Sequence, residues 1–187
     1  MNSVTLIPLS NGCVRSWRIA DAPSLARHAN DRDIWLNLRD AFPHPYTEAD
    51  GRAYIERARS SRPETLLCIE VDGQAAGGIG YGIHQDVERF SAEIGYWLGR
   101  RFWGRGIVTE ALRAVTAHAF RVHGLHRLFA LPYAGNAASC RVLEKAGYRL
   151  EGRLREHSFK DGRFVDQLLY AIVVGEVLPA RAPGEPA

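Results

Sequence analysis

Residues 91–123 join a strand pattern, a glycine-containing loop and a helix pattern with no linker between them. Side chains alternate along residues 91–98, which predicts a strand with one buried face. That face carries Ala92, Ile94, Tyr96 and Leu98, and the other carries Ser91, Glu93, Gly95 and Trp97. A helix is expected from about Gly104 to His123, with Gly124 as its stop. Its apolar stripe steps by four and three residues: Val108, Leu112, Val115, Ala119 and Val122. This arrangement favours a sheet covered by helices.

The rest of the chain supplies further short elements in a strand-rich order. Strands are expected at residues 4–7, 13–18, 65–71, 74–83, 91–98, 127–133, 152–159 and 163–173. Helices are expected at residues 21–30, 34–38, 47–60, 104–123 and 136–146. Asn11-Gly12 and Asp72-Gly73 are expected hairpin turns, and Thr47 with Asp50 resembles a capping box. The order predicts a mixed sheet with helices on both faces.

The connections between these elements are short, and the sequence contains no internal repeat. We therefore expect one domain over residues 1–178. Residues 179–187 hold three of the nine prolines and are expected to form a flexible C-terminal tail.

Composition excludes several classes of protein. The chain has 187 residues, of which 46% are hydrophobic and 24% charged, as in a globular protein. No apolar run is long enough for a membrane span, and no secretory signal begins the chain, so a cytoplasmic protein without a membrane partner is expected. The net charge of +3 is too small to indicate direct nucleic-acid binding. Three widely spaced cysteines and scattered histidines predict neither a disulfide framework nor a metal site.

The loop from Arg101 to Gly106 has the features of a phosphate-binding turn. It lies between a strand and a helix, and a helix N-terminus offers unpaired N–H groups with about half a positive charge. Gly104 and Gly106 let the backbone approach a ligand, while Arg101 and Arg105 add charge. The Walker and Rossmann glycine patterns are both absent. A turn shaped by its glycines without any ligand is the alternative interpretation.

The same loop carries a family resemblance. Arg101-x-x-Gly104-x-Gly106 after a strand resembles the [QR]xxGx[GA] acetyl-CoA signature of the GNAT N-acetyltransferase superfamily. Other blocks resemble the branch that acetylates the N-terminal alanine or serine of ribosomal proteins. They are residues 42–47 (FPHPYT), 93–98 (EIGYWL), 109–112 (TEAL), 136–139 (NAAS), 143–148 (LEKAGY), and Asp161-Gly162 with Asp166. The resemblance covers about residues 13–173.

This resemblance implies an α+β GNAT fold with a mostly antiparallel sheet in which one pair of neighbouring strands splays apart. It implies acetyl-CoA as co-substrate, held at its pantetheine arm by backbone groups of Tyr96, Trp97 and Leu98. The pyrophosphate would be surrounded by Arg101, Gly104, Arg105, Gly106, Val108 and Thr109. Asn136 would bond a pantetheine amide or simply cap its helix.

Acetyl transfer to an amine requires a neutral nucleophile. A free α-amine has a pKa of about 8 and a lysine about 10.4, a difference worth roughly 3 kcal/mol at pH 7. One modest base therefore suits an α-amine better than a lysine. Glu93, on the strand face shared with Gly95 and Trp97, is the candidate base or amine anchor. A solvated surface carboxylate is the alternative.

The departing thiolate of coenzyme A requires a proton or a hydrogen bond. The resemblance to this branch implies that role for Ser139. Many GNAT enzymes instead have a tyrosine acid at the position that Leu143 occupies here, so a tyrosine acid is absent at that position. A serine hydroxyl is a weak acid, so its contribution is expected to be a hydrogen bond to sulfur. Cys140 is next to Ser139, but a small cysteine without a histidine partner is usually buried filler.

The acceptor groove is expected near Trp35, Phe42, Tyr46 and His157. Arg141 and Lys145 suit either the 3′-phosphate of coenzyme A or an ordinary wet helix face. The sequence thus predicts an N-acetyltransferase that acts in a ternary complex on a protein N-terminal α-amine. A small amine such as a polyamine or xenobiotic is the alternative acceptor, and a non-catalytic acyl-CoA-binding module is the alternative class. Whether the chain forms a homodimer stays open.

Overall fold

The computed structural model describes residues 5–176, which contain one eight-stranded sheet in the order β1-β2-β3-β4-β5-β6-β8-β7. The strands are β1 (Leu6–Leu9), β2 (Gly12–Arg15), β3 (Leu66–Val71), β4 (Gln74–Ile83), β5 (Ser91–Leu98), β6 (Arg127–Ala130), β7 (Arg149–Lys160) and β8 (Arg163–Val173). Every neighbouring pair is antiparallel except β5 and β6. The predicted mixed, mostly antiparallel sheet is confirmed.

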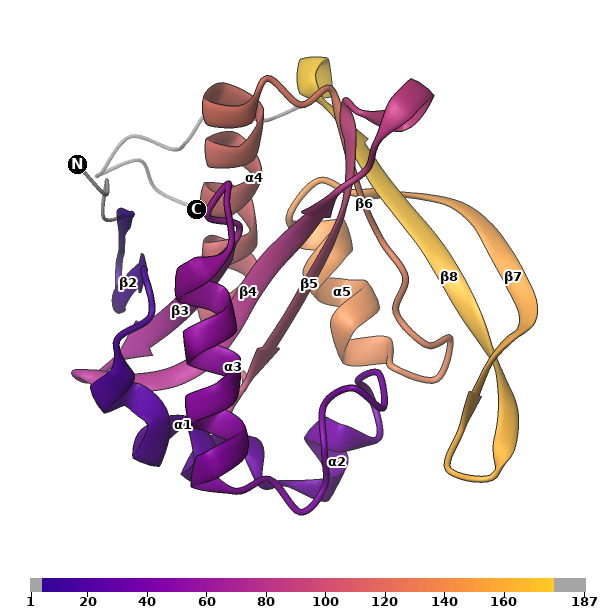
Figure 1. Cartoon of the computed structure of the whole chain (residues 1–187). Helices are drawn as coiled ribbons and strands as arrows, with labels where there is room; N and C mark the ends of the chain where they lie inside the picture. The colour runs from indigo at the N-terminus through magenta and orange to yellow at the C-terminus, as the bar shows by residue number, and fades with distance from the viewer. Residues whose placement is uncertain (1–4, 177–187) are drawn as a thin grey trace.

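Helices cover both faces of this sheet, as the sequence predicts. They are α1 (Ala22–Ala29), α2 (Arg32–Trp35), α3 (Glu48–Ser60), α4 (Ile107–His123) and α5 (Ala137–Lys145). Figure 1 shows α1 and α3 in front of the sheet and α4 and α5 behind it. Because side chains alternate along a strand, β3 feeds two cores: Cys68 packs with α1 and α3, whereas Leu67 and Ile69 pack with α4. Each face of the sheet therefore has its own hydrophobic core.

The parallel pair separates soon after it forms. Ser91, Ala92 and Glu93 pair with residues 127–129, and no pairing follows. β6 ends at Ala130 and the chain turns away toward α5, while β5 continues to Leu98 beside β4 alone. Figure 1 shows β5 diverging from β8, which lies on the other side of β6. One edge of β5 beyond Glu93 thus has no strand partner within the described residues, which is the splayed pair that the resemblance implies.

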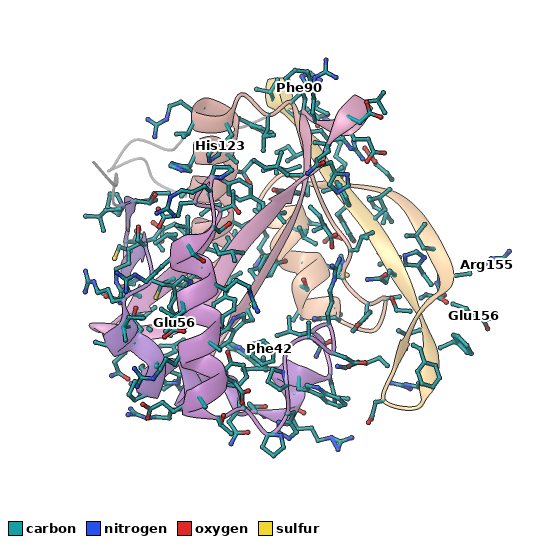
Figure 2. All side chains as sticks on the ribbon, viewed as in Figure 1. Phe42, Glu56, Phe90, His123, Arg155 and Glu156 are labelled. Atoms are coloured by element: carbon teal, nitrogen blue, oxygen red, sulfur yellow. The ribbon has the colours of Figure 1, made fainter. Side chains whose placement is uncertain are left out.

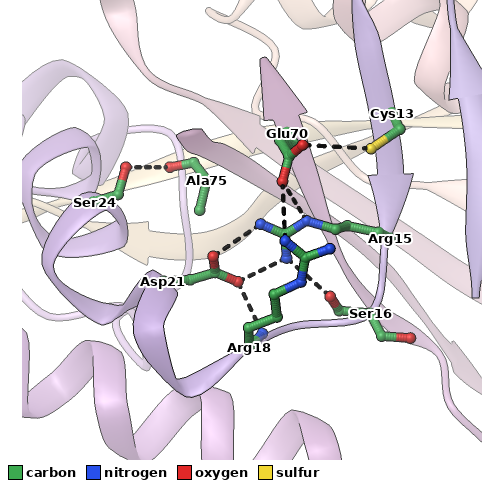
Figure 3. A network of polar contacts seen from close by, with 8 residues as sticks. All are labelled: Cys13, Arg15, Ser16, Arg18, Asp21, Ser24, Glu70 and Ala75. Carbon is green, nitrogen blue, oxygen red and sulfur yellow. Dashed lines mark hydrogen bonds and ion pairs between the residues drawn. The ribbon is translucent and has the colours of Figure 1, made fainter. Parts of the chain in front are cut away.

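A buried ion-pair network fixes the start of α1 to the sheet (Figure 3). Arg15 of β2 is 3% exposed, and its two terminal nitrogens lie 2.8 Å from the two carboxylate oxygens of Asp21. Its Nε donates to Glu70 of β3 at 2.5 Å. The Asp21 carboxylate also accepts from the backbone N–H of Arg18. The position of Asp21 in the sequence predicts that its side chain caps α1. In the structure the carboxylate is bonded to Arg15 instead and does not cap the helix.

Several expected element boundaries differ from those observed. The first hairpin is displaced: the strand expected at 4–7 runs over Leu6–Leu9, and Gly12 belongs to β2 rather than to the turn. A Cβ on Gly12 would lie 2.0 Å from the carbonyl oxygen of Glu70, so the close approach of β3 explains this glycine. The strand expected to reach Tyr133 ends at Ala130, although an isolated bridge still joins Tyr133 to Gln167 of β8.

The long helix also differs from its prediction. It begins at Ile107, after a short 3-10 turn at Arg100–Phe102. The apolar stripe was expected to extend to Val122, which is instead 52% exposed. Thr116 in the middle of the helix and Phe120 in its last turn are buried, so the buried face follows the helical period of 3.6 rather than the assumed steps.

Two further expectations concern the chain as a whole. No helix within residues 5–176 is both long and apolar enough to cross a membrane. The tail expected at 179–187 lies outside the described residues, and the single domain over 1–178 stays a prediction.

We expect Leu143→Ala to destabilise the fold by about 2–5 kcal/mol, because Leu143 is fully buried on the inner face of α5 and the substitution leaves a cavity. Leu150→Ala is the matched control, since Leu150 is 56% exposed and its truncation should cost roughly 0.5 kcal/mol or less. Urea unfolding of both variants measures the two values. Equal losses would show that α5 is not held by this core.

Candidate active site

A cleft of about 1170 Å³ crosses the sheet where β5 and β6 part. Phe42 and Tyr46 line it from the side of α1 and α3, and Val108 and Ser139 line it from the side of α4 and α5. The cleft is continuous because no strand fills the space beside the second half of β5. A ligand on one face of the sheet can therefore meet a ligand on the other.

The start of α4 lines this cleft with backbone groups. Gly104 and Gly106 both have φ of 74°, a conformation that favours glycine, and a Cβ on either would meet nothing within 4 Å. Gly106 occupies the N-cap position, and no side chain of the described residues caps the helix there. Val108 and Thr109 of the first turn also line the cleft. The uncapped N–H groups make this end of the cleft suitable for an anion.

The structure brings almost all predicted site residues to the cleft. The predicted residues that line it are Glu93, Tyr96, Trp97, Leu98, Gly104, Arg105, Gly106, Val108, Thr109, Asn136 and Ser139. Arg101 is the exception: its guanidinium lies over the Phe102 ring at 4.7 Å, outside the lining. Arg105 lies 3.7 Å from Asp72 across the loop. Arg141 and Lys145 of α5 complete a positive margin.

Ser139 is held by groups on either side of it. The Asn136 side chain accepts from the Ser139 N–H at 3.0 Å, which caps α5 as predicted. The Tyr96 hydroxyl lies 2.9 Å from Ser139 Oγ and donates to the Ser139 carbonyl at 3.3 Å. Burial raises the pKa of Tyr96, so this phenol stays protonated and remains a donor. The sequence assigned only the backbone of Tyr96 to the site; its hydroxyl was missed.

Glu93 is engaged by a residue that the sequence did not single out. Nη2 of Arg39 donates to both Glu93 carboxylate oxygens, at 2.5 and 2.7 Å. Arg39 lies in the segment between α2 and α3 and lines the cleft opposite β5. No motif or spacing in the sequence pairs these two residues, which are 54 positions apart.

The side of the cleft next to α2 and α3, where the acceptor groove is expected, is aromatic. The ring of Phe42 lies 4.7 Å from that of Tyr46 and 5.5 Å from that of Trp97, and Phe42 sits between α3 and α2 (Figure 2). The Trp97 side chain therefore faces the acceptor side, although the sequence proposed only its backbone as a cofactor ligand. Tyr133 and Gln167, which the sequence did not mark, also line the cleft.

Two residues expected in the acceptor groove do not line it. Trp35 packs against His44 and lies under the ammonium of Lys160, 3.7 Å from its ring centroid. His157 borders a separate hollow on β7. Arg155 and Glu156, which border the same hollow, point outward from the outer edge of β7 (Figure 2). The strand bulges between Leu154 and Ser158, which turns this segment away from the cleft.

Neither a reactive cysteine nor a metal-binding cluster is found in the part of the cleft that the structure describes. Cys140 is 8% exposed, and burial raises the pKa of its thiol, so it is a poor nucleophile. Among residues 5–176, no group of three or more His, Cys, Asp or Glu side chains is arranged to hold a metal ion.

A family model described as an acetyltransferase (GNAT) domain matches residues 13–149. The chain belongs to the GNAT acetyltransferase family. RimJ of Mycobacterium smegmatis, solved in complex with CoA-disulfide, is 29% identical with a TM-score of 0.81, over 95% of this chain and 89% of RimJ. The uncharacterized N-acetyltransferase p20 of Bacillus licheniformis is 26% identical over 172 residues, 87% of this chain and 93% of p20.

One further relative of this GNAT enzyme has a named acceptor. The ribosomal-protein-serine acetyltransferase of Escherichia coli is 34% identical over 84 residues. This match covers 45% of the chain and 47% of that relative, so the chain spans about half the length of the relative that it matches.

The tyrosines of this acetyltransferase should resist ionisation. Burial raises the pKa of all seven: Tyr46, Tyr54 (to about 12), Tyr81, Tyr96, Tyr133, Tyr148 and Tyr170. Above pH 10 the unfolded chain loses phenol protons that the folded chain keeps, so stability falls as pH rises. We expect phenolate absorbance to appear together with loss of circular dichroism, and urea-unfolded protein to titrate near pH 10. Ionisation near pH 10 with an intact fold would contradict this.

Proposed function

We propose that the enzyme transfers an acetyl group from acetyl-CoA to the N-terminal α-amine of a protein, of the ribosomal-protein type. The observation that carries the proposal is the cleft through the sheet, which Glu93 lines on β5 and Ser139 lines on α5. The similarity to the ribosomal-protein-serine acetyltransferase of Escherichia coli supports the acceptor class. Direct transfer in a ternary complex fits a cleft open to both faces.

The described residues fit acetyl-CoA, which supplies the acetyl group as a thioester. The uncapped N–H groups at Gly106, Val108 and Thr109 and the side chain of Arg105 would hold the pyrophosphate. The unpaired edge of β5 at residues 96–98 would bond the pantetheine amides, with Asn136 opposite. Arg101 is retained only as a nearby positive charge, because its side chain lies outside the cleft.

On the acceptor side, Glu93 would attract the ammonium form of the α-amine and accept its proton at a carboxylate oxygen. The amine nitrogen then has the lone pair that attack on the thioester carbon requires. Attack makes a second N–H proton acidic, and this proton would pass to the departing thiolate, which gives the amide and the free thiol of coenzyme A. Phe42, Tyr46 and Trp97 would surround the first side chain of the acceptor and exclude water from it.

On the cofactor side, Ser139 would donate a hydrogen bond to the sulfur as the carbon–sulfur bond breaks. Tyr96 would hold the Ser139 hydroxyl by donating its phenol proton to Oγ rather than to the Ser139 carbonyl, which leaves the single hydroxyl proton of Ser139 for the sulfur. The buried Cys140 leaves no accessible thiol for an acetylated enzyme intermediate at this position, which favours direct transfer.

A peptide panel tests the function. The purified chain with acetyl-CoA is mixed with peptides that have a free N-terminal alanine or serine, with the same peptides N-acetylated but carrying a lysine, and with spermidine. We expect thiol release and acetylation at the α-amine of the free peptides. Acetylation of spermidine or lysine alone would indicate a different acceptor, and binding of acetyl-CoA without any transfer would indicate a non-catalytic module.

Glu93→Gln should lower kcat/KM by about 100-fold at neutral pH, because a general base contributes roughly 10²–10⁴. The variant should keep only the pH dependence of the peptide's own amine, which has a pKa of about 8. Rates between pH 6 and 10 measure both effects. An unchanged rate and pH profile would exclude Glu93 as the base.

Ser139→Ala should lower kcat about tenfold, the magnitude of one hydrogen bond to a charged group, while the Kd for acetyl-CoA stays within about twofold. Ser60→Ala, at the exposed end of α3, is the matched control and should leave both constants unchanged. Single-turnover kinetics and calorimetry supply the two values. Loss of binding with unchanged turnover would contradict the assigned role.

A further inference from the structure

Arg39 covers the carboxylate that the proposed chemistry requires. One guanidinium nitrogen bonds both oxygens of Glu93, which is where an incoming ammonium would bond. The Arg39 side chain is 72% exposed and that of Glu93 27%. Ion pairs this exposed typically contribute 0–1 kcal/mol to stability, so the fold does not depend on this contact. The contact instead bears on the site, because it occupies the Glu93 carboxylate.

The residues on either side of Arg39 are bonded to distant segments of the chain. The Tyr133 hydroxyl, from the loop after β6, donates to the Leu38 carbonyl at 3.4 Å. On the other side, Lys160 Nζ donates to Asp40 Oδ1 at 2.6 Å. The structure therefore holds the short segment 38–40 at both of its ends, with Arg39 between them.

The Lys160 anchor is itself buried. Lys160 lies at the end of β7 and is 3% exposed, and its ammonium also lies over the Trp35 ring. Arg32 and Asp161 form a second ion pair between α2 and the same hairpin. A lysine is rarely buried to this extent unless its charge is compensated. The contacts with Asp40 and the Trp35 ring supply that compensation. The contact with Asp40 fixes the segment from which the exposed Arg39 side chain reaches Glu93.

We propose that Arg39 occupies, in the free enzyme, the position on Glu93 that the acceptor's ammonium takes, and that it returns once the acceptor is acetylated. This inference rests on the proposed function of Glu93. The exchange replaces one cation by another, so Glu93 is never left as an unpaired charge in the cleft. An acetylated amine is neutral and cannot compete with the guanidinium, so the return of Arg39 favours release of the product.

The same exchange selects the class of acceptor. An aliphatic α-amine, with a pKa of about 8, is largely protonated at neutral pH and compensates Glu93 when Arg39 leaves. An aromatic amine, which is neutral at this pH, displaces Arg39 without replacing its charge. Arg39 is thus a specificity-determining residue that favours cationic amines.

Arg39→Gln tests the exchange, since it removes the charge and retains hydrogen-bonding groups. We expect KM for a peptide with a free N-terminus to fall about fivefold, the upper range for an exposed ion pair. Inhibition by the N-acetylated peptide should strengthen by a similar factor. Arg39→Lys, which keeps the charge, should stay within about twofold of the wild type. Arg52→Gln on the outer face of α3 is the matched control, because Arg52 forms an exposed ion pair with Glu48 outside the cleft.

A double-mutant cycle measures the same coupling without relying on turnover. Calorimetry with the free peptide should show tighter binding to Arg39→Gln than to the wild type, and no such gain when Arg39→Gln is added to Glu93→Gln. A gain that persists without the Glu93 carboxylate would overturn the proposal.

The two levels of inference fail in different ways. If the wild type acetylates no free N-terminus, the proposed function is wrong. If the wild type is active but Arg39→Gln raises KM, or leaves both KM and product inhibition unchanged, Arg39 is not displaced by the acceptor and only this inference is wrong.

Discussion

The early end of the parallel pairing between β5 and β6 is the constraint on which the site depends. Three residues of β5 pair with β6, and the remaining five keep only their antiparallel partner β4. A backbone edge that lacks a strand must bond to something else, because peptide groups are obligatory donors and acceptors. The same divergence opens a path through the sheet, which a continuously paired strand would close.

The two cores explain how a sheet can be split in this way and remain rigid. On one face α4 packs on the sheet through Leu112 and Val115, and α5 joins the same cluster through Leu143. On the other face α1 and α3 pack around Leu25 and Ile55, and the buried Arg15 network fixes the start of α1. Each wall of the cleft is thus held by its own apolar cluster. The hairpin of β7 and β8 contacts α2 through charged side chains instead. The contacts that hold this end of the cleft are therefore weaker than the two apolar clusters.

The sequence predicts what local chemistry determines and misses what distant segments decide together. Alternation in residues 91–98 and the glycines at 104 and 106 predict the strand, the turn and the helix start, because each depends on its own residues. The contacts of Arg39 with Glu93, Tyr96 with Ser139 and Lys160 with Asp40 join residues 54, 43 and 120 positions apart. Such pairs leave no periodic pattern in the sequence. The sequence likewise assigns the glycine at position 12 to a turn, whereas the structure shows that a side chain there would collide with the neighbouring strand β3.

The strengths of the available acids favour a division of labour across the sheet. A thiol has a pKa of about 8.5 and an unperturbed phenol about 10, and burial raises that of Tyr96 further. A thiolate is therefore too weak a base to take a proton from Tyr96, and a serine hydroxyl is a weaker acid still. Hydrogen bonding stabilises the leaving sulfur without any such transfer. In the proposed reaction the acceptor's ammonium must lose one proton before attack, and a carboxylate already paired with a cation lies on that side. The proposed chemistry thus places proton removal on the face of Trp97 and sulfur stabilisation on the face of Tyr96, with β5 supplying Glu93 for the first and, through Tyr96, the positioning of Ser139 for the second.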